Sequence, residues 1–234
     1  MKKYGLLLLG LLFLFASCSG EDQKSQMVVE GRVKGLKKGT LYLQYIPDSV
    51  LVTLDSLEIR GDGAFRLQAR VGEPDLYYLY LSKADNNILD DRISFFGEPG
   101  QYRIESSWNA FEADAVIRGT ESQEKYAVYK ENMSRFNLER LELARALNAV
   151  EETVDSARID SLQSLLDQNL RRSYLYTLNF ALNNKDSYLA PFITFTEVPD
   201  ANPKYLDSVY QALPPDIAGS KYGKKLKELL GTVR

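Results

Sequence analysis

The hydrophobic pattern of this chain changes once, near Gly119, and that change constrains the fold more than any motif. Before Gly119, apolar and polar residues alternate in short runs that Gly and Pro turns separate, as is typical of β-strands. After Gly119, apolar residues recur every three or four positions, which is the period of an α-helix. We therefore predict an α+β chain, with a β-sandwich-like domain over 27–118 and an α-helical module over 119–234.

Eight runs in the first part have the length and composition of strands. The sequence Gly61-Asp62-Gly63 predicts a tight hairpin, because an Asp-Gly step tolerates the positive φ angles that such a turn requires. No helical pattern interrupts the series, so we expect antiparallel sheets packed as a β-sandwich or a partial barrel. The expected strands are 27–33, 41–46, 50–60, 64–71, 76–81, 92–96, 102–106 and 115–118.

The second part predicts a long helical pair followed by short helices. The first helix follows Gly119 and has an inward stripe of Tyr126, Tyr129, Met133 and Phe136, continued after a shift of face by Leu141, Ala144 and Leu147. The second helix, over 155–183, has an inward stripe of Ile159, Leu162, Leu165, Leu166, Leu170 and Leu178. Prolines divide the remainder into helices over 186–195, 203–213 and 216–230. We expect the helical face to pack partly on the sheet, since its stripe must be buried.

The N-terminus predicts export and lipid anchoring. Lys2 and Lys3 precede an apolar run that is too short to span a membrane, and Ala16-Ser17 precede the single cysteine, Cys18. This arrangement resembles a bacterial lipobox, so we expect a signal peptide over 1–17, lipid attachment at Cys18 and a polar tether over 18–26. Glu21 and Asp22 resemble the acidic signal that directs lipoproteins to the cell surface in some Gram-negative bacteria, and a solvated linker explains them nearly as well. The predicted location is the outer membrane, on its surface or its periplasmic face.

Two absences in the sequence exclude common chemistries. The chain has no histidine, which removes Ser-His and Cys-His nucleophile pairs and His-ligated metals. Acylation of Cys18 would leave no thiol for redox chemistry. Without Lys2 and Lys3 the 29 basic residues fall to 27, against 32 acidic ones, so nucleic acid is not expected as a partner. We predict no cofactor, no metal and no catalytic residue.

Three groups of residues are candidate ligand sites, and each also has an ordinary structural explanation. Oxygen ligands in Asp85-Asn86-Asn87 and Asp90-Asp91 would suit calcium, although a solvated turn is favoured because the spacing lacks the pattern of a calcium loop. The lysines of the last helix suit its dipole or an anionic partner; they are Lys221, Lys224, Lys225 and Lys227. Six aromatic residues could form a platform for a sugar ring, although aromatic residues in alternating strands more often pack as cross-strand pairs in the core. They are Tyr77, Tyr78, Tyr80, Phe95, Phe96 and Trp108.

The order of motifs resembles one known family. After the lipobox come Val29-Glu30-Gly31-Arg32-Val33, Asp55-Ser56 leading to Gly61-Asp62-Gly63-Ala64-Phe65, and the turn residues Glu73-Pro74, Glu98-Pro99-Gly100 and Ile117-Arg118-Gly119-Thr120. This order resembles the N-terminal domain of unknown function that precedes a thioredoxin-like domain in Gram-negative thiol-disulfide oxidoreductase lipoproteins. The sequence shown ends at Arg234 without a Cys-x-x-Cys motif, so the resemblance implies the accessory module alone.

We therefore expect a lipid-anchored cell-envelope protein that binds or scaffolds and is not an enzyme. Its partners would be the membrane, through the lipid, and an envelope protein or a glycan. The alternatives are a surface glycan-binding lipoprotein and, third, a carboxylate-based hydrolase. A facing aromatic pair exposed on one sheet would favour glycan binding, whereas two carboxylates about 5 to 9 Å apart in a cleft would favour hydrolysis.

Overall fold

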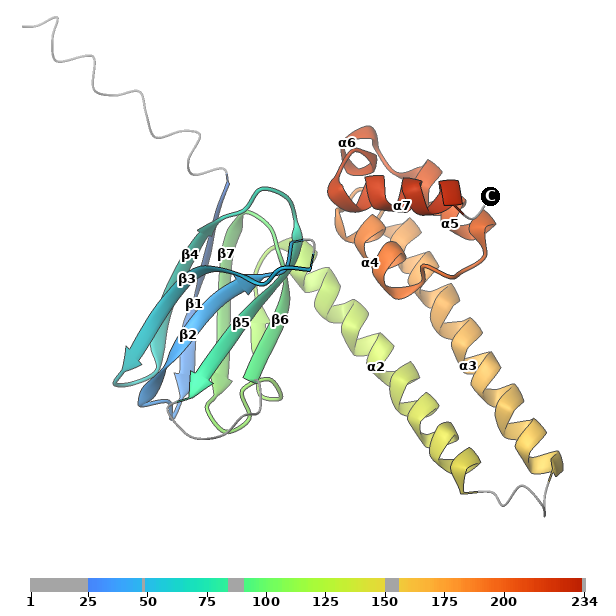
Figure 1. The fold of residues 1–234 in the computed structure, drawn as a ribbon, viewed down its shortest axis with the longest axis horizontal. Coiled ribbons are helices and arrows are strands. Elements are labelled where there is room, and N and C mark those ends of the chain that lie inside the picture. The colour runs from blue at the N-terminus through green and yellow to red at the C-terminus, as the bar shows by residue number, and fades with distance from the viewer. Residues whose placement is uncertain (1–24, 48, 84–90, 150–155, 233–234) are drawn as a thin grey trace, which may run out of the picture. The chain divides into compact units, whose positions relative to one another are not determined.

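The computed structural model describes residues 25–47, 49–83, 91–149 and 156–232. These residues form two compact units that divide between Gly119 and Thr120, and each unit is considered by itself. The α+β class is confirmed, because the first unit is built from strands and the second from helices (Figure 1).

Two four-stranded sheets form the first unit. Their strand orders are β4–β1–β7–β8 and β3–β2–β5–β6 (Figure 1). All eight predicted strands are present, within a few residues at each end. The strands are β1 (Gln26–Lys34), β2 (Lys38–Tyr45), β3 (Val52–Arg60), β4 (Ala64–Arg70), β5 (Asp75–Lys83), β6 (Asp91–Gly97), β7 (Gly100–Ser107) and β8 (Val116–Arg118).

Two pairings differ from the sequence expectation. Strands β1 and β7 run parallel, with Met27 opposite Gly100, whereas we expected antiparallel sheets. The predicted hairpin at Gly61–Gly63 is wrong, because β3 pairs with β2 and β4 pairs with β1. The Gly residues do adopt positive φ angles, but the turn carries the chain from the edge of one sheet to the edge of the other.

The core lies between the two sheets and contains a row of aromatic rings. Tyr45 stacks on Tyr77 at 5.4 Å, and Phe95 lies 5.2 Å from Tyr102, which belongs to the other sheet. The hydroxyl of Tyr102 accepts a hydrogen bond from the Glu98 backbone N–H at 2.9 Å, so the buried phenol has a polar partner. Because these rings face the core, buried and outward-facing residues alternate along the strands that carry them.

Asp55 ties the two edge strands β3 and β4 together. Its carboxylate accepts a hydrogen bond of 2.8 Å from the backbone N–H of Gln68. The register of β2 and β3 shifts between Leu43 and Gln44, opposite this part of β3. Asp55, which belongs to the motif that carried the family resemblance, therefore has a structural role in closing one side of the sandwich.

Two long helices and four shorter ones make up the described part of the second unit. The long helices α2 and α3 pack against each other, and α4, α5, α6 and α7 gather at one end of the pair (Figure 1). The helices are α2 (Glu121–Asn148), α3 (Ser156–Asn183), α4 (Leu189–Glu197), α5 (Pro203–Ala212), α6 (Pro215–Ala218) and α7 (Lys221–Thr232). The helix predicted over 216–230 is interrupted, because α6 ends at the C-cap Gly219.

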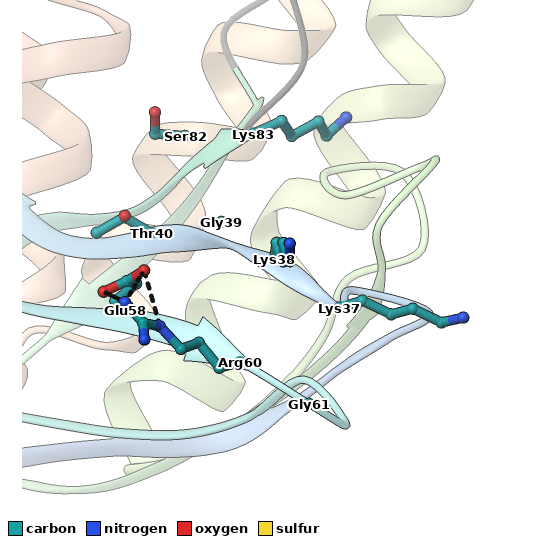
Figure 2. A pocket seen from close by; sticks show the side chains of 9 residues that line it. All are labelled: Lys37, Lys38, Gly39, Thr40, Glu58, Arg60, Gly61, Ser82 and Lys83. Carbon is teal, nitrogen blue, oxygen red and sulfur yellow. Dashed lines mark hydrogen bonds and ion pairs between the residues drawn. The ribbon is translucent and has the colours of Figure 1, made fainter.

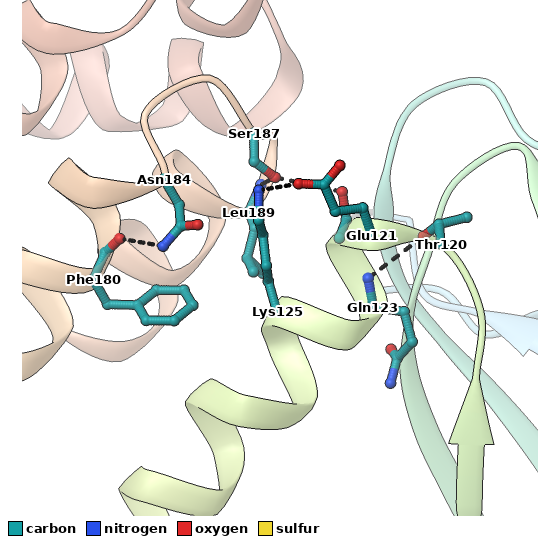
Figure 3. Close-up of polar contacts among 9 residues, drawn as sticks. Thr120, Glu121, Gln123, Lys125, Phe180, Asn184, Ser187 and Leu189 are labelled. Carbon is teal, nitrogen blue, oxygen red and sulfur yellow. Dashed lines mark hydrogen bonds and ion pairs between the residues drawn. The ribbon is translucent and has the colours of Figure 1, made fainter.

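Local polar contacts fix the ends of these helices. The Thr120 side chain caps α2 by accepting from the Gln123 backbone N–H, and Glu121 pairs with Lys125 at 2.7 Å in the first turn (Figure 3). Ser187 accepts from the Leu189 backbone N–H where α4 begins (Figure 3). Such caps satisfy backbone groups that a helix end leaves unpaired.

The expected inward stripes are confirmed only in part. Tyr126, Tyr129 and Leu178 are buried. On the surface of α2, Glu131 and Arg135 form an ion pair at 3.1 Å. Leu141, Leu165 and Leu170 were expected to face inward but are exposed, at 46%, 43% and 40% of their surface. The buried face of α3 instead includes the polar residues Asn169, Ser173 and Thr177. Asn169 and Thr177 bond to residues of α2, whereas the Ser173 hydroxyl donates to the Leu170 carbonyl within α3.

Candidate binding face

The predicted aromatic platform divides between the core and the surface. Tyr77, Phe95 and Phe96 are buried, so these three residues do not form an exposed platform. Tyr78 and Tyr80 alternate with the core residues of β5 and are partly exposed on its outer side. Trp108 follows β7 and is 45% exposed, with the Lys83 ammonium 5.8 Å from its ring.

Tyr42 completes an aromatic pair on the outer side of the sheet β3–β2–β5–β6. It lies directly opposite Tyr80 in the antiparallel register of β2 and β5, and their ring centroids are 5.9 Å apart at an interplanar angle of 30°. Cross-strand aromatic pairs of this kind stabilise a sheet modestly. We did not include Tyr42 among the platform candidates, although its position between the core residues Leu41 and Leu43 indicated an outward side chain.

Arg92 of β6 completes this surface. Its guanidinium carbon lies 5.5 Å from the Tyr78 ring and 5.6 Å from the Tyr80 ring, which is the range of cation–π attraction. We call Tyr42, Gln44, Tyr78, Tyr80 and Arg92 the tyrosine–arginine face.

Two buried polar atoms on this face have no hydrogen-bond partner within the described residues. They are the Oε1 atom of Gln44 and the Nε atom of Arg92. The amide nitrogen of Gln44 donates to the Thr53 hydroxyl at 3.3 Å. Unsatisfied buried polar atoms are rare in native structures, so their presence distinguishes this face from an ordinary solvated sheet surface.

The charge state of the face follows from its surroundings. Burial raises the pKa of Tyr78, while the positive charge of Arg92 acts in the opposite direction. The net direction is upward, so the Tyr78 phenol stays neutral at physiological pH and its O–H can donate a hydrogen bond.

A basic hollow of about 530 Å³ adjoins this face. Thr40 and Ser82, which lie opposite each other on β2 and β5, line it next to the Tyr42–Tyr80 pair. Figure 2 shows the complete lining, which consists of Lys37, Lys38, Gly39, Thr40, Glu58, Arg60, Gly61, Ser82 and Lys83. The hollow thus has four cationic side chains and one carboxylate.

A second hollow, of about 200 Å³, lies on the outer side of the other sheet and has balanced charges. Glu30 pairs with Arg66, and Arg103 pairs with Glu105. Arg32, also in the lining, pairs with Asp62, whose pKa is lowered first by the Ala64 backbone N–H and then by Arg32. These are exposed ion pairs of a solvated sheet surface, which contribute little individually.

The lysines of α7 cover aromatic rings. Lys225 lies 5.8 Å from the Phe195 ring and 5.6 Å from the Tyr222 ring, and Lys221 lies 5.4 Å from the Tyr222 ring. Lys224 and Lys227 are exposed. The helix therefore does not gather its four lysines around one hollow, unlike the strands of the first unit.

Other predicted sites lie partly or wholly outside the described residues. Cys18 and the residues Asp85, Asn86, Asn87 and Asp90 belong to that part of the chain, and Asp91 begins β6. In the parts that the structure does describe, no three carboxylates come together as a metal site. None of the helices in those parts has the length and hydropathy needed to cross a bilayer.

The fold and this face define a β-sandwich module that presents an aromatic and cationic surface. Residues 27–126, which cover the strands and the beginning of α2, match the family model of a domain of unknown function, DUF4369. This match confirms the part of the resemblance that named such a domain. No thioredoxin domain is evident in the described residues. A search of curated proteins finds no match to the chain.

Proposed function

We propose that this chain is a lipid-anchored, non-catalytic binding protein of the bacterial cell envelope, and that it binds a glycan on the tyrosine–arginine face. The observation that supports this function most strongly is the Tyr42–Tyr80 pair, because a partly exposed aromatic pair on one sheet is the feature that favours glycan binding over the alternatives. Arg92 adds a cation beside the same rings.

The chemistry of the face suits a sugar. The apolar C–H groups of a sugar ring pack against an aromatic ring, while its hydroxyl groups need hydrogen-bond partners nearby. Tyr42 and Tyr80 supply the rings, and the tyrosine hydroxyls and the Arg92 guanidinium supply polar atoms. Tyrosine also loses little conformational entropy on binding, since it has only two side-chain torsions.

The hydrolase alternative receives less support from the two hollows. The basic hollow has one carboxylate, Glu58, and both of its oxygens bond to Arg60, at 3.0 and 2.9 Å. In the second hollow, Glu30 and Glu105 each bond to an arginine. Glycoside hydrolysis requires two carboxyl groups that face the substrate, whereas these carboxylates are engaged by arginines of the protein.

The cell-envelope setting follows from the lipobox and from the resemblance to the accessory domain of thioredoxin-like lipoproteins. Lipidation at Cys18 would hold the module at the outer membrane, within reach of envelope polysaccharides. In this proposal the tether over 18–26 separates the binding module from the bilayer.

The double variant Tyr42→Ala/Tyr80→Ala tests this function. The processed full-length protein in non-ionic detergent is assayed by calorimetry against polygalacturonate, dextran sulfate, mannan and dextran. We expect at least one polysaccharide to bind, and the double variant to bind it about tenfold more weakly or worse, as expected when central aromatic contacts are lost. Tyr205→Ala, at a 51% exposed tyrosine in the helical unit, is the matched control and should not change binding.

Two outcomes would contradict the proposed function. One is that none of the four polysaccharides binds. The other is that the double variant, with an unchanged circular dichroism spectrum, binds as well as the wild type. The spectrum is needed because the Tyr42–Tyr80 pair also contributes to the stability of the sheet.

A further inference from the structure

We propose that the basic hollow binds the carboxylate or sulfate groups of an acidic polysaccharide, whose chain continues along the tyrosine–arginine face. This inference rests on the proposed function for the class of ligand, and it assigns a charge and a second subsite to that ligand. The hollow is a surface of this chain that the family match does not explain.

The charges that line the basic hollow are not balanced. The complete chain has a formal net charge of −3, yet four cationic side chains and one carboxylate line this hollow. Glu58 is fully engaged by Arg60. Lys37 and Lys38 are exposed, and the structure contains no ion pair of either ammonium group with another described residue. Their charges are therefore available to an external anion.

The basic hollow is lined by both charged and neutral hydrogen-bond donors. Lys37 and Lys38 provide ammonium groups, and Thr40 and Ser82 provide hydroxyl groups on the neighbouring strands (Figure 2). Charged and neutral donors around one hollow match the several acceptor oxygens of a carboxylate or a sulfate. The second hollow of the same unit also contains cations, but each of them is bonded to a carboxylate of the protein.

The basic hollow is continuous with the tyrosine–arginine face. Along β2 and β5 the outward pairs follow one another as Thr40–Ser82, Tyr42–Tyr80 and Gln44–Tyr78. Successive outward residues of a strand are about 6.7 Å apart, so these three pairs extend over about 13 Å. A row of this length suits several units of a polymer better than an isolated small anion.

The shape of the surface favours a glycan over the other anionic macromolecules. A flat anionic membrane would need only exposed lysines, whereas these lysines line a hollow of about 530 Å³ together with the Thr40 and Ser82 hydroxyls. An acidic peptide could pair with the lysines, but its carboxylate side chains would not pack on the partly exposed tyrosine rings in the way that the C–H groups of a sugar do. Preferential binding of a membrane or of an acidic peptide would contradict the proposal.

The test measures binding of the processed full-length protein to polygalacturonate, which carries carboxylates, and to dextran sulfate, which carries sulfates. Unmodified dextran is the neutral control, polyglutamate is the peptide control and phosphatidylglycerol vesicles are the membrane control. We expect at least one acidic polysaccharide to bind at least about tenfold more tightly than dextran, polyglutamate or the vesicles. Its affinity should fall as salt is raised, because the contact is electrostatic.

Charge variants assign the binding to the hollow. Lys37→Ala/Lys38→Ala should weaken binding of the acidic polysaccharide about tenfold or more, since two exposed cations are lost. Lys224→Ala/Lys227→Ala removes the same charge from α7 and should change the affinity less than about twofold. Glu58→Gln should act in the opposite direction and strengthen binding several-fold, because it removes the one carboxylate and releases Arg60.

The outcomes separate this inference from the proposed function. If Tyr42→Ala/Tyr80→Ala weakens binding but Lys37→Ala/Lys38→Ala acts like the α7 control, the basic hollow is not a subsite and the inference is wrong, while the glycan-binding function stands. Preferential binding of dextran would likewise show that the basic hollow is not a subsite, while the glycan-binding function stands. Preferential binding of polyglutamate or of vesicles shows that the class of ligand is wrong, which overturns the inference as well. If no polysaccharide binds, both proposals fail.

Discussion

Gly63 is a single position at which the backbone leaves no room for a side chain. Its φ angle is +77°, and a Cβ atom there would lie 2.0 Å from the carbonyl oxygen of Val33. The Gly63 carbonyl in turn accepts a hydrogen bond of 2.9 Å from the Val33 N–H. The turn that passes between the sheets is therefore held against β1 by a contact that only glycine permits.

Gly63→Ala should lower the free energy of unfolding of the first unit by about 2 to 4 kcal/mol, because a non-glycine residue at this angle is strained and the Val33 carbonyl must also move. Urea unfolding followed by the fluorescence of Trp108, the only tryptophan, measures the change. Gly72→Ala is the control, since a Cβ there meets nothing within 4 Å. Equal stability of Gly63→Ala and the wild type would show that the turn can relax.

Individual side chains also show how far the candidate site could be predicted. The alternation of β5 places Tyr78 and Tyr80 on the outside of the sheet and Tyr77 in the core, whereas all three were platform candidates from the sequence. Phe96 is buried although it occupies the same side of β6 as Arg92, so alternation alone did not separate platform from core. Arg92 was not predicted, because only the register of β5 and β6 brings it beside two tyrosine rings.

At the level of strands and helices, local signals predicted the elements better than their partners. All eight strands were expected, but the Asp-Gly signal at Asp62 specified backbone angles and not the strand that would pair with β4. The parallel pairing of β1 with β7 joins residues more than seventy positions apart, and no local pattern encodes it. The break at Gly219 was missed because one glycine in a helical pattern is often tolerated.

A buried hydroxyl pair links the helices α2 and α3. The Thr177 hydroxyl donates to the Ser173 carbonyl at 3.0 Å and lies 2.9 Å from the Tyr129 hydroxyl, so Tyr129 is the donor to Thr177. Burial also raises the pKa of Tyr129, which keeps its hydroxyl protonated. Removing one partner should therefore cost more than removing both.

Thr177→Val should destabilise the helical unit by about 1 to 3 kcal/mol, since it leaves the Tyr129 hydroxyl buried without its partner. In the double variant Tyr129→Phe/Thr177→Val the loss should be smaller than the sum of the two single losses, by about 1 kcal/mol. Thermal unfolding monitored at 222 nm measures these values, and Thr196→Val on an exposed position of α4 is the control. Strictly additive losses would mean that the hydroxyls do not interact.

The whole molecule combines a predicted membrane anchor with two folded units. The anchor is read from the sequence alone, because Cys18 lies outside the described residues. Each unit has its own buried residues, and the described helices do not span a membrane.

Cys18→Ala should abolish labelling by a fatty-acid analogue and leave the precursor uncleaved, because lipoprotein processing requires the cysteine that carries the lipid. Gel mobility and labelling with an alkyne fatty acid in the native host measure both effects. Ser19→Ala, one residue further, should be labelled and processed normally. Normal processing of the Cys18→Ala protein would refute the lipobox interpretation.

The position of β1 inside its sheet determines how the sandwich would carry a mechanical load. The first strand begins at Gln26, and it is hydrogen-bonded to β4 on one side and to β7 on the other. A pull on the N-terminus along the strand would act on both ladders of hydrogen bonds at once, in shear, rather than peel an edge strand away bond by bond. A module tethered through this end should therefore resist mechanical unfolding when a long polymer pulls on its outer surface.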